Sequence, residues 1–399
     1  MSKLVRVTTI PLSLDKLLTG QLRFMASYFD VLAVSSEGPE IESIKHREGC
    51  KHFVVPMTRT ISPFKDSVSL WSMIKLIKKE KPDIVHSHTP KAGLIAMLAA
   101  YYCKTPIRLH TVAGLPLMET KGFRKKLLIW VEKLTYKCAQ CVYPNSLELK
   151  KYIEENKFTS PEKLKVLGMG SSNGIDVNYY KRTTTIIEEA EVLRNNYGIS
   201  ASELVFIFVG RIVKDKGIKE LVNAFDQLNK KYRTIKLILV GPFEDELDPI
   251  QPETRKLIEH NKNILITGFI NDIRPYLAAS NVLTFPSYRE GFPNVPLQAG
   301  CFELPMIVTD INGCNEIVQN GVNGLLVLPK DEVALQSAME RMINDEDFRK
   351  CCAKVSRHMI VENYSRENVW NALLKEYKNL LEVKEINLTH VSKIPETNF

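Results

Sequence analysis

Apolar runs of strand length alternate with helix-type patterns along almost the whole chain. In the first half these runs fall at 4–9, 83–86, 107–110 and 164–167. The rhythm then starts again, with runs at 204–210, 236–241, 263–267, 282–285 and 306–309. Strands that alternate with helices assemble into parallel sheets with helices on both faces. The pattern therefore predicts an α/β protein with two doubly wound domains.

The length of the chain also supports two domains. A chain of 399 residues exceeds what one hydrophobic core usually holds and suits two domains of roughly 150 to 200 residues. The polar stretch 178–203 interrupts the apolar pattern, so we expect the boundary there, with domains at 1–180 and 181–365. Helical patterns at 331–344, 347–362 and 366–383 close the chain. We expect residues 366–399 to form a helix that packs back on the first domain, followed by a polar tail.

Composition narrows the class of protein without naming a function. The chain is 44% hydrophobic and 25% charged, with no apolar run of 18 residues and no basic-then-apolar start. These features predict a folded protein of the cytoplasm. The one C-x-x-C pair among eight cysteines, Cys138 and Cys141, has no second ligand pair, so we expect free thiols. The net charge of +8 fits nucleic acid, anionic lipid or an anionic small substrate, and does not choose among them.

The first candidate site follows the predicted strand 204–210. Gly210 and Gly217 allow the backbone to approach a ligand closely, and Arg211 can hold two phosphate oxygens at once. Lys216 adds a point charge near the start of the next helix. The loop fits a diphosphate, and a solvated basic turn is the alternative interpretation.

The second candidate site follows the predicted strand 282–285. A loop of Gly, Pro and Asn leads there into a helix with Pro296 in its first turn, so free backbone N–H groups face the loop. Glu290 can accept hydrogen bonds from sugar hydroxyls, and Gln298 offers an amide to a diol. A plain strand-to-helix connection with incidental polar residues is the alternative.

Taken together, these segments resemble a known family. The chain resembles the retaining GT-B glycosyltransferases of family 4. The resemblance lies in Gly210-Arg211 with Lys216-Gly217, in Glu290-Gly291-Phe292-Pro293, and in the stretches 83–93, 173–176 and 310–316. Within that family the chain resembles bacterial enzymes that extend lipid-carried precursors of capsule, O-antigen or exopolysaccharide. The resemblance implies the GT-B fold, in which two Rossmann-like domains face an interdomain cleft. The acceptor would bind on the first domain and the nucleotide sugar on the second.

The resemblance also implies the partners and the reaction. The donor would be a nucleoside-diphosphate sugar, with UDP as the expected nucleotide, and the acceptor a lipid-diphosphate-linked saccharide. The transferred group would be a hexose or an N-acetylhexosamine, with retention of configuration. No cofactor and no metal ion are expected. Nucleic acid is not an expected partner either, because the chain lacks interleaved aromatic platforms.

Roles for individual residues follow from the same resemblance. The expected catalytic residues are Glu290, beside the anomeric carbon, and His110, which would reach across the cleft to the donor sugar. The donor diphosphate would be bound by Arg211, Lys216, Gly291, Phe292, Pro293, Asn294 and Val295. Gly20 and His88 are candidates for an acceptor or phosphate loop. Gln298 would bind the ribose, although the family usually has Glu at this position.

Two questions stay open at this point. A double displacement with Glu290 as nucleophile and a same-face attack shielded by the leaving group both fit the residues. In addition, the neutral Gln298 suggests a second hypothesis, a nucleotide-sugar-binding subunit that has lost catalysis. The two hypotheses differ in whether bound donor is turned over.

Three further segments have more than one interpretation. The basic and aromatic helix predicted at 121–137 fits either an anionic membrane surface, on the inner face of the cytoplasmic membrane, or a domain helix with a solvated basic face. Asp345-Glu346-Asp347 has the spacing of a metal-binding D-x-D motif, but we interpret it as a helix cap. His86 and His88 share one face of a strand, where His88 fits an acceptor contact or a structural role.

Overall fold

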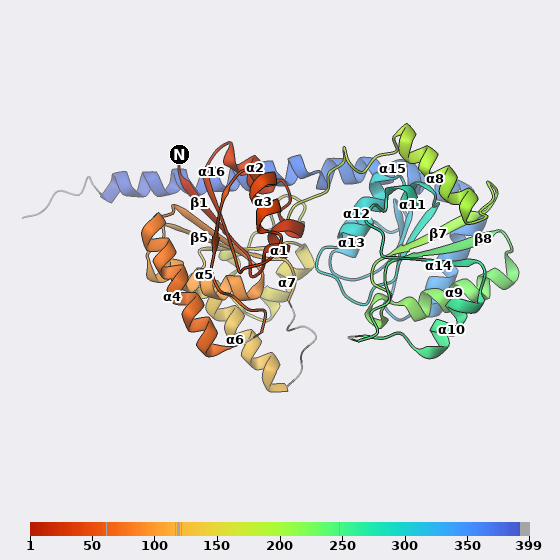
Figure 1. Ribbon diagram of the computed structural model, residues 1–399, viewed down its shortest axis with the longest axis horizontal. Helices are drawn as coiled ribbons and strands as arrows, with labels where there is room; N and C mark the ends of the chain where they lie inside the picture. Colours follow the sequence, from red (N-terminus) through yellow and green to blue (C-terminus); the bar gives the residue numbers. More distant parts are fainter. Residues whose placement is uncertain (61, 116, 118–119, 121, 247, 392–399) are drawn as a thin grey trace, which may run out of the picture. The chain divides into compact units, whose positions relative to one another are not determined.

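The computed structural model describes residues 1–60, 62–115, 117, 120, 122–246 and 248–391. The chain forms two compact units (Figure 1). Unit 1 comprises Met1–Gly174 together with the chain from Glu367 onward, and unit 2 comprises Ile175–Arg366. Each unit contains its own parallel six-stranded sheet with helices around it (Figure 1). The α/β fold with two doubly wound domains is therefore confirmed.

The sheet of unit 1 has the strand order β3-β2-β1-β4-β5-β6. Its strands are β1 Lys3–Val7, β2 Asp30–Ser35, β3 Lys51–Val54, β4 Ile84–His88, β5 Ile107–Val112 and β6 Cys141–Pro144. Its helices are α1 Pro11–Leu17, α2 Gln21–Ala26, α3 Ile41–Glu48, α4 Pro63–Glu80, α5 Pro90–Tyr102, α6 Gly122–Cys138, α7 Leu147–Glu155 and α16 Arg366–Val391. Alternate residues of β1 point to opposite faces, so Val5 and Val7 pack against α4, α5 and α6, whereas Leu4 packs against α1, α2 and α16. Both faces are covered, and the strands are accordingly apolar almost throughout.

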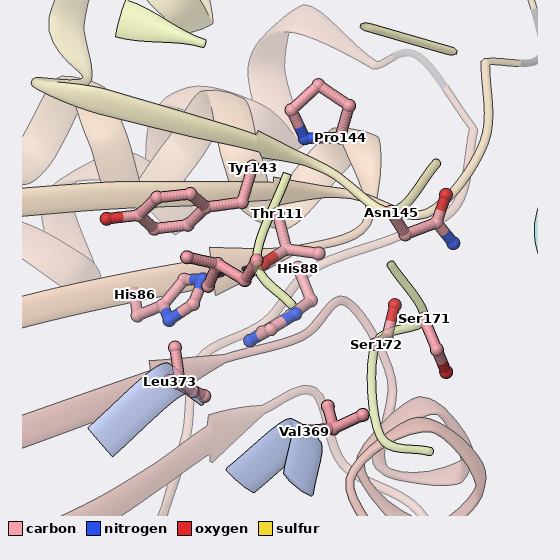
Figure 2. Close-up of a pocket in the computed structure, with 11 residues that line it drawn as sticks. His86, His88, Thr111, Tyr143, Pro144, Asn145, Ser171, Ser172, Val369 and Leu373 are labelled. Atoms are coloured by element: carbon pink, nitrogen blue, oxygen red, sulfur yellow. Dashed lines mark hydrogen bonds between the residues drawn. The ribbon is translucent and has the colours of Figure 1, made fainter. Parts of the chain in front are cut away.

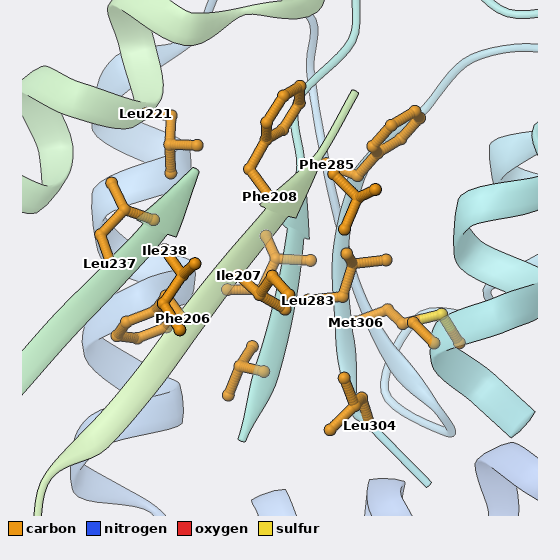
Figure 3. Close-up of a cluster of buried hydrophobic side chains, with 14 of the residues drawn as sticks. Phe206, Ile207, Phe208, Leu221, Leu237, Ile238, Leu283, Phe285, Leu304 and Met306 are labelled. Atoms are coloured by element: carbon orange, nitrogen blue, oxygen red, sulfur yellow. The ribbon is translucent and has the colours of Figure 1, made fainter. Parts of the chain in front are cut away.

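The sheet of unit 2 has the strand order β12-β11-β10-β7-β8-β9. Its strands are β7 Leu204–Val209, β8 Ile235–Val240, β9 Ile264–Gly268, β10 Val282–Phe285, β11 Met306–Thr309 and β12 Gly324–Val327. Its helices are α8 Thr184–Asn196, α9 Ile218–Lys231, α10 Pro252–His260, α11 Arg274–Ala278, α12 Asn294–Cys301, α13 Cys314–Ile317, α14 Glu332–Asn344 and α15 Glu346–Tyr364. Figure 3 shows the centre of the core, where side chains of β7, β8 and β10 interdigitate with Leu221 of α9. This packed core fixes the loops that follow β7 and β10.

One predicted strand is wrong. Residues 164–167 form no strand, and only Leu164 makes a single bridge to Val142. The short 3-10 turn η2 at Pro161–Lys163 comes directly before it. The position beside β5 is occupied by β6, which the predicted set of strands lacks, as it lacks β2, β3 and β12.

The compact units divide between Gly174 and Ile175, ahead of the expected boundary at 180/181. Hydrogen bonds to the backbone of 175–180 account for this position. The Ile175 N–H donates to the Tyr364 carbonyl at 2.8 Å, and the Arg357 guanidinium donates to the Tyr180 carbonyl at 3.0 Å. Residues 175–180 therefore belong with unit 2.

The acidic triplet 345–347 is a helix cap, as interpreted from the sequence. Asp345 precedes α15 and accepts a hydrogen bond from the Phe348 N–H at 3.0 Å. Glu346 and Asp347 lie in the first turn, where negative charge favours the helix.

Candidate active site

A glycine brings the two predicted loops of unit 2 together. Gly217 ends the loop after β7 with a φ of +69°, and a Cβ added to it would lie 2.0 Å from the carbonyl oxygen of Pro286. Pro286 directly follows β10, so only a glycine permits this approach. The loops after β7 and β10 are in contact because these strands are neighbours in the sheet.

An ion pair joins the two loops at their polar side chains. Lys216 Nζ lies 2.6 Å from Glu290 Oε1, and the two side chains are 16% and 15% exposed. The sequence assigns the cation to the donor diphosphate and the carboxylate to the donor sugar. The structure places the two side chains next to each other, and their roles at a donor stay predictions.

Asp215 ties the loops further. Its carbonyl oxygen accepts from the Tyr288 N–H at 2.8 Å, and its carboxylate accepts from Arg289 Nε at 2.9 Å. Tyr288 in turn donates its hydroxyl to Glu220 of α9 at 2.6 Å, and desolvation with this carboxylate partner raises the pKa of Tyr288. These contacts hold the backbone around Lys216 and Glu290.

Arg211 belongs to the same edge of the sheet. Its side chain is half-exposed and pairs with Glu244, which lies in the loop after β8. Post-strand loops of three neighbouring strands therefore contribute charged groups here. Both cations predicted to bind phosphate are held by carboxylates, which an incoming anion would have to displace.

The start of α12 provides further donors. Pro293 precedes the helix and gives no side-chain cap, so the first turn keeps backbone N–H groups for an acceptor. The loop before it is fixed by Asn312, whose Nδ2 donates to the carbonyl oxygens of Glu290 at 3.1 Å and Gly291 at 2.6 Å. Gly313, with a φ of +76°, allows this approach, since a Cβ there would lie 2.5 Å from the Gly291 oxygen.

Gln298 lies in the second turn of α12, and its side-chain hydrogen bond goes to a residue outside the charged cluster. Its Nε2 donates to the Tyr180 hydroxyl at 2.8 Å. The amide that the sequence offers to a ribose is therefore engaged by a tyrosine. Tyr180 is a residue that reasoning from the sequence did not single out.

His110 lies in unit 1 on β5 and is 2% exposed. Its Nδ1 lies 2.9 Å from Ser87 Oγ, and Gly93 of α5 makes room for the ring, because a Cβ there would lie 2.4 Å from His110 Cε1. Burial lowers the pKa of His110 to about 4, so the ring is neutral near pH 7. Its implied role at the donor sugar stays a prediction.

Gly20 and His88 also lie in unit 1. Gly20 precedes α2, and its N–H donates to Glu48 Oε1 at 2.8 Å, so in this arrangement a carboxylate occupies the amide that a phosphate would use. His88 ends β4, stacks on His86 with ring centroids 4.4 Å apart, and lines a small cavity (Figure 2). Burial, with the nearby Arg6 charge, lowers the pKa of His88 well below its ordinary value.

Among the described residues, no cluster of three or more His, Cys, Asp or Glu side chains has the arrangement of a metal site. Over the same residues, every helix is too short or too polar to cross a membrane. The described cysteines are free thiols.

Sequence reasoning assigned no role to several residues that shape the site, among them Asp215, Tyr180, Glu244 and Asn312. Glu244 carried a usable signal, because it lies in another post-strand loop of the same sheet. Asn312 lies in the stretch 310–316 that resembles the family, but that stretch gave no indication of its contact with the Glu290 loop. Tyr180 gave no signal, since its contact depends on how distant segments pack.

Two family models match the chain in succession. The model for glycosyl transferase 4-like domains matches residues 23–170, and the model for glycosyl transferases group 1 matches residues 189–359. The capsular polysaccharide biosynthesis glycosyltransferase CapM of Staphylococcus aureus is 35% identical over 386 residues, which are 96% of this chain and 98% of CapM. This chain therefore belongs to the family of glycosyltransferases that these two models describe and that includes CapM.

Two more proteins are similar to this glycosyltransferase, one in sequence and one in structure. It is 29% identical to the UDP-Gal:alpha-D-GlcNAc-diphosphoundecaprenol alpha-1,3-galactosyltransferase of Escherichia coli, over 84% of this chain and 86% of that enzyme. It also matches the crystal structure of HepE from Anabaena in complex with UDP, with a TM-score of 0.79, 18% identity, and coverage of 95% of this chain and 100% of that one. The glycosyltransferase therefore has the GT-B fold predicted from its sequence.

Proposed function

We propose that this glycosyltransferase moves a sugar from a UDP-sugar to a lipid-diphosphate-linked saccharide during assembly of a bacterial surface polysaccharide. The observation that carries the proposal is the Lys216–Glu290 pair at 2.6 Å, with Arg211 on the adjacent loop. This arrangement puts cations for a diphosphate beside a carboxylate for a sugar. The name of the Escherichia coli relative supports the acceptor and the nucleotide, and the name of the Staphylococcus aureus relative supports the surface polysaccharide.

The reaction needs stabilisation of the leaving group above all. As the bond to the anomeric carbon breaks, negative charge grows on the departing diphosphate. Arg211 and Lys216 supply positive charge, and the first turn of α12 supplies backbone N–H donors. The loops that carry these groups are tied to one another through Asp215 and Asn312, so their backbone needs little reorganisation when charge develops.

Glu290 is the carboxylate available to the sugar. Its backbone carbonyl accepts from Asn312, and its side chain is paired with Lys216. When the diphosphate takes over Lys216, the Glu290 carboxylate becomes free to accept hydrogen bonds from the donor sugar or to stabilise an oxocarbenium-like anomeric carbon. We propose that the transfer retains the configuration at the anomeric carbon, either by double displacement or by same-face attack.

The direct test is turnover of a donor panel by the full-length chain. UDP- and GDP-sugars are incubated with a polyprenyl-diphosphate-linked N-acetylhexosamine, and release of the nucleotide and the lengthened acceptor are both measured. We expect transfer from at least one UDP-sugar and a loss of about 100-fold or more in kcat/KM for Arg211→Ala. Tight donor binding without turnover would instead support a binding subunit, and no binding of any donor would contradict both.

We also propose that unit 1 contacts an anionic membrane surface through α4 and α6. Phe123 and Trp130 of α6 are 82% and 60% exposed, and Phe64 and Trp71 of α4 are 83% and 60% exposed. Each pair is seven residues apart, which is two helical turns, so each lies along one stripe of its helix. Helix α5 packs between α4 and α6, which places the two stripes in the same layer.

Charge on these helices fits the same partner. Basic residues of α6 are Arg124, Lys125, Lys126, Lys133 and Lys137. Its one acidic residue, Glu132, is buried, and the acidic residues of α4 are ion-paired, Asp66 with Lys91 and Glu80 with Lys3. Exposed aromatics beside cations are the pattern of helices that lie on anionic lipid.

Vesicle binding tests this surface. The chain should sediment with vesicles that contain phosphatidylglycerol and stay in solution with pure phosphatidylcholine. The double variant Phe123→Ser/Trp130→Ser should lose binding, whereas Val333→Ser, at a 75% exposed position of α14, should not. Equal binding of the double variant and the unaltered chain would contradict the assignment.

A further inference from the structure

One face of the unit 1 sheet turns polar toward the carboxyl ends of its strands. Near the start of these strands the face carries Leu4 and other aliphatic residues. Two positions further along β1, β4 and β5, the same face carries Arg6, His86 and Thr111. These three side chains are buried beneath helices. Burial of polar groups on a helix-covered face is costly unless they have partners. His86 and Thr111 have partners, because His86 Nε2 lies 2.7 Å from Thr111 Oγ1 and His86 Nδ1 lies 2.5 Å from the Tyr377 hydroxyl.

Arg6 is the exception in this group. Its side chain is 0% exposed, and its Nη2 donates to Gln21 Oε1 at 2.5 Å and to His88 Nε2 at 2.8 Å. Its Nε and Nη1 have no hydrogen-bond partner among the described residues. Within the same part of the chain no carboxylate pairs with it. A buried positive charge without a counter-charge is strongly unfavourable, so it calls for a compensating anion.

Arg6 fixes the proton of His88. An arginine only donates, so Nε2 of His88 must accept, and the proton of the neutral ring then lies on Nδ1. His88 lines the cavity at the carboxyl ends of β4, β5 and β6. The Nδ1–H of His88 is therefore a hydrogen-bond donor, and the Arg6 charge lies on the Nε2 side of the ring.

Arg6 lies behind His88 and does not itself line the cavity, but two residues of the lining carry unpaired polar atoms. Ser172 and Asn145 both line it, as Figure 2 shows. Ser172 Oγ and Asn145 Oδ1 are buried without a hydrogen-bond partner among the described residues. The hydroxyl can donate to an anion, whereas the amide oxygen needs a donor such as a hydroxyl. The unpaired groups therefore match a ligand that carries an anionic oxygen and a hydroxyl close together.

The cavity leaves about 20 Å³ for the centres of water-sized groups. That is enough for one such group and too little for a whole phosphate. We propose that this cavity is an anion subsite that admits a single phosphoryl or carboxylate oxygen, held by His88 and Ser172 with Arg6 behind them. The rest of the ligand stays at the mouth, with a hydroxyl directed to Asn145. This inference rests on the proposed function, since a sugar linked to a diphosphate offers both groups.

Histidine NMR on the full-length chain tests the subsite. The ring signals of His88 are assigned with a His88→Gln variant and followed while inorganic phosphate, methyl phosphate or acetate is added. We expect the Nδ1–H proton of His88 to move downfield as the anion accepts its hydrogen bond. Ser172→Ala should weaken phosphate binding about tenfold, because it removes one hydrogen bond to a charged group. Ser67→Ala, at an exposed serine of α4, is the matched control and should leave binding unchanged.

The same experiment separates the sources of the anion. If phosphate also raises the KM for the lipid-diphosphate acceptor, and Ser172→Ala raises it without changing donor hydrolysis, the oxygen belongs to the acceptor. If phosphate moves the His88 signal but leaves that KM alone, the site binds a free anion. A His88 signal that responds to none of the probes or the acceptor overturns the inference. The proposed function fails separately, by the absence of nucleotide release from every donor.

Discussion

Lys216 and Glu290 form a 2.6 Å ion pair between loops that follow neighbouring strands of unit 2. Both side chains are mostly buried, so the pair is screened less by water than a surface pair. The cation is therefore held at a defined position before a donor arrives. Under the proposed function, a donor diphosphate would take Lys216 from Glu290, and that exchange would release the carboxylate to the sugar. Donor binding would then control whether the Glu290 carboxylate is free.

Lys216→Ala should lower kcat/KM for the donor by about 100-fold or more, because it removes a fixed positive charge from the leaving group. UDP release from the best UDP-sugar is the measurement. Lys219→Ala is the matched control, since Lys219 is an exposed lysine on α9 close by in sequence, and it should stay within about twofold of the unaltered enzyme. Equal losses in both variants would mean that net charge matters and the position of Lys216 does not.

Glu244→Gln should strengthen binding of UDP. Arg211 is half-exposed and pairs with Glu244, so the variant frees the guanidinium for phosphate. The gain is small, about two- to fivefold at low salt, because exposed pairs are weak. Calorimetry at low and at high ionic strength checks it, and the gain should shrink as salt screens the charges. Weaker binding of UDP to the variant would show that Glu244 itself contacts the ligand.

Much of unit 2 could be predicted from its sequence because its strands are continuous apolar runs. The predicted strands 282–285 and 306–309 coincide with β10 and β11, and the other three predicted strands of unit 2 differ from β7, β8 and β9 by one residue at their ends. Unit 1 was harder. The edge strand β3, Lys51–Val54, has no fully buried residue, so it lacks an apolar run to find.

Some residues of the candidate site could also be predicted from the sequence, whereas their contacts could not. Arg211, Lys216 and Glu290 could be named from their place after strands, because the carboxyl ends of parallel strands share one edge. Their partners could not be named. The contact of Arg211 with Glu244, and of Lys216 with Glu290, depends on the order β10-β7-β8, which periodicity along the chain does not specify. The roles assigned to all of these residues, at the diphosphate, the sugar, the ribose and the acceptor, remain predictions.

Gln298→Glu should increase the affinity for UDP about three- to tenfold, because a carboxylate accepts more strongly from the ribose hydroxyls than an amide does. The Tyr180 hydroxyl, which now accepts from Gln298 at 2.8 Å, can rotate to donate to the new carboxylate. Calorimetry with UDP and with 2′-deoxy-UDP measures the effect. An equal gain for both nucleotides, or no gain for either, would place position 298 away from the ribose diol.

Gly217→Ala should destabilise unit 2 more than Gly198→Ala. Both glycines have a left-handed φ, +69° and +63°, so both variants pay a backbone cost of about 1 to 2 kcal/mol. Only at Gly217 does the new Cβ meet another atom, the Pro286 oxygen at 2.0 Å, whereas Gly198 has open space. Denaturant unfolding of both variants measures the difference. Equal free energies of unfolding would show that the loops after β7 and β10 separate without cost.

Stability should fall on acidification, in part through His110. Burial lowers the pKa of this ring from 6.5 to about 4 in the folded protein. Between these two values the unfolded chain binds a proton that the folded chain does not, so acid favours unfolding. The contribution is complete above pH 6.5 and is lost as the pH falls to 4, by about 3 kcal/mol at most.

The variant His110→Gln isolates this contribution from the other buried histidines. It removes one titrating group, so its free energy of unfolding should fall less steeply than that of the unaltered protein from pH 6.5 to pH 4. Above pH 7 the difference between the two should be constant, because neither state of the ring is protonated there. Denaturant unfolding at a series of pH values checks both statements. Parallel curves over the whole range would mean that His110 takes up its proton equally in the folded and unfolded chain, which its burial against Gly93 and Ser87 opposes.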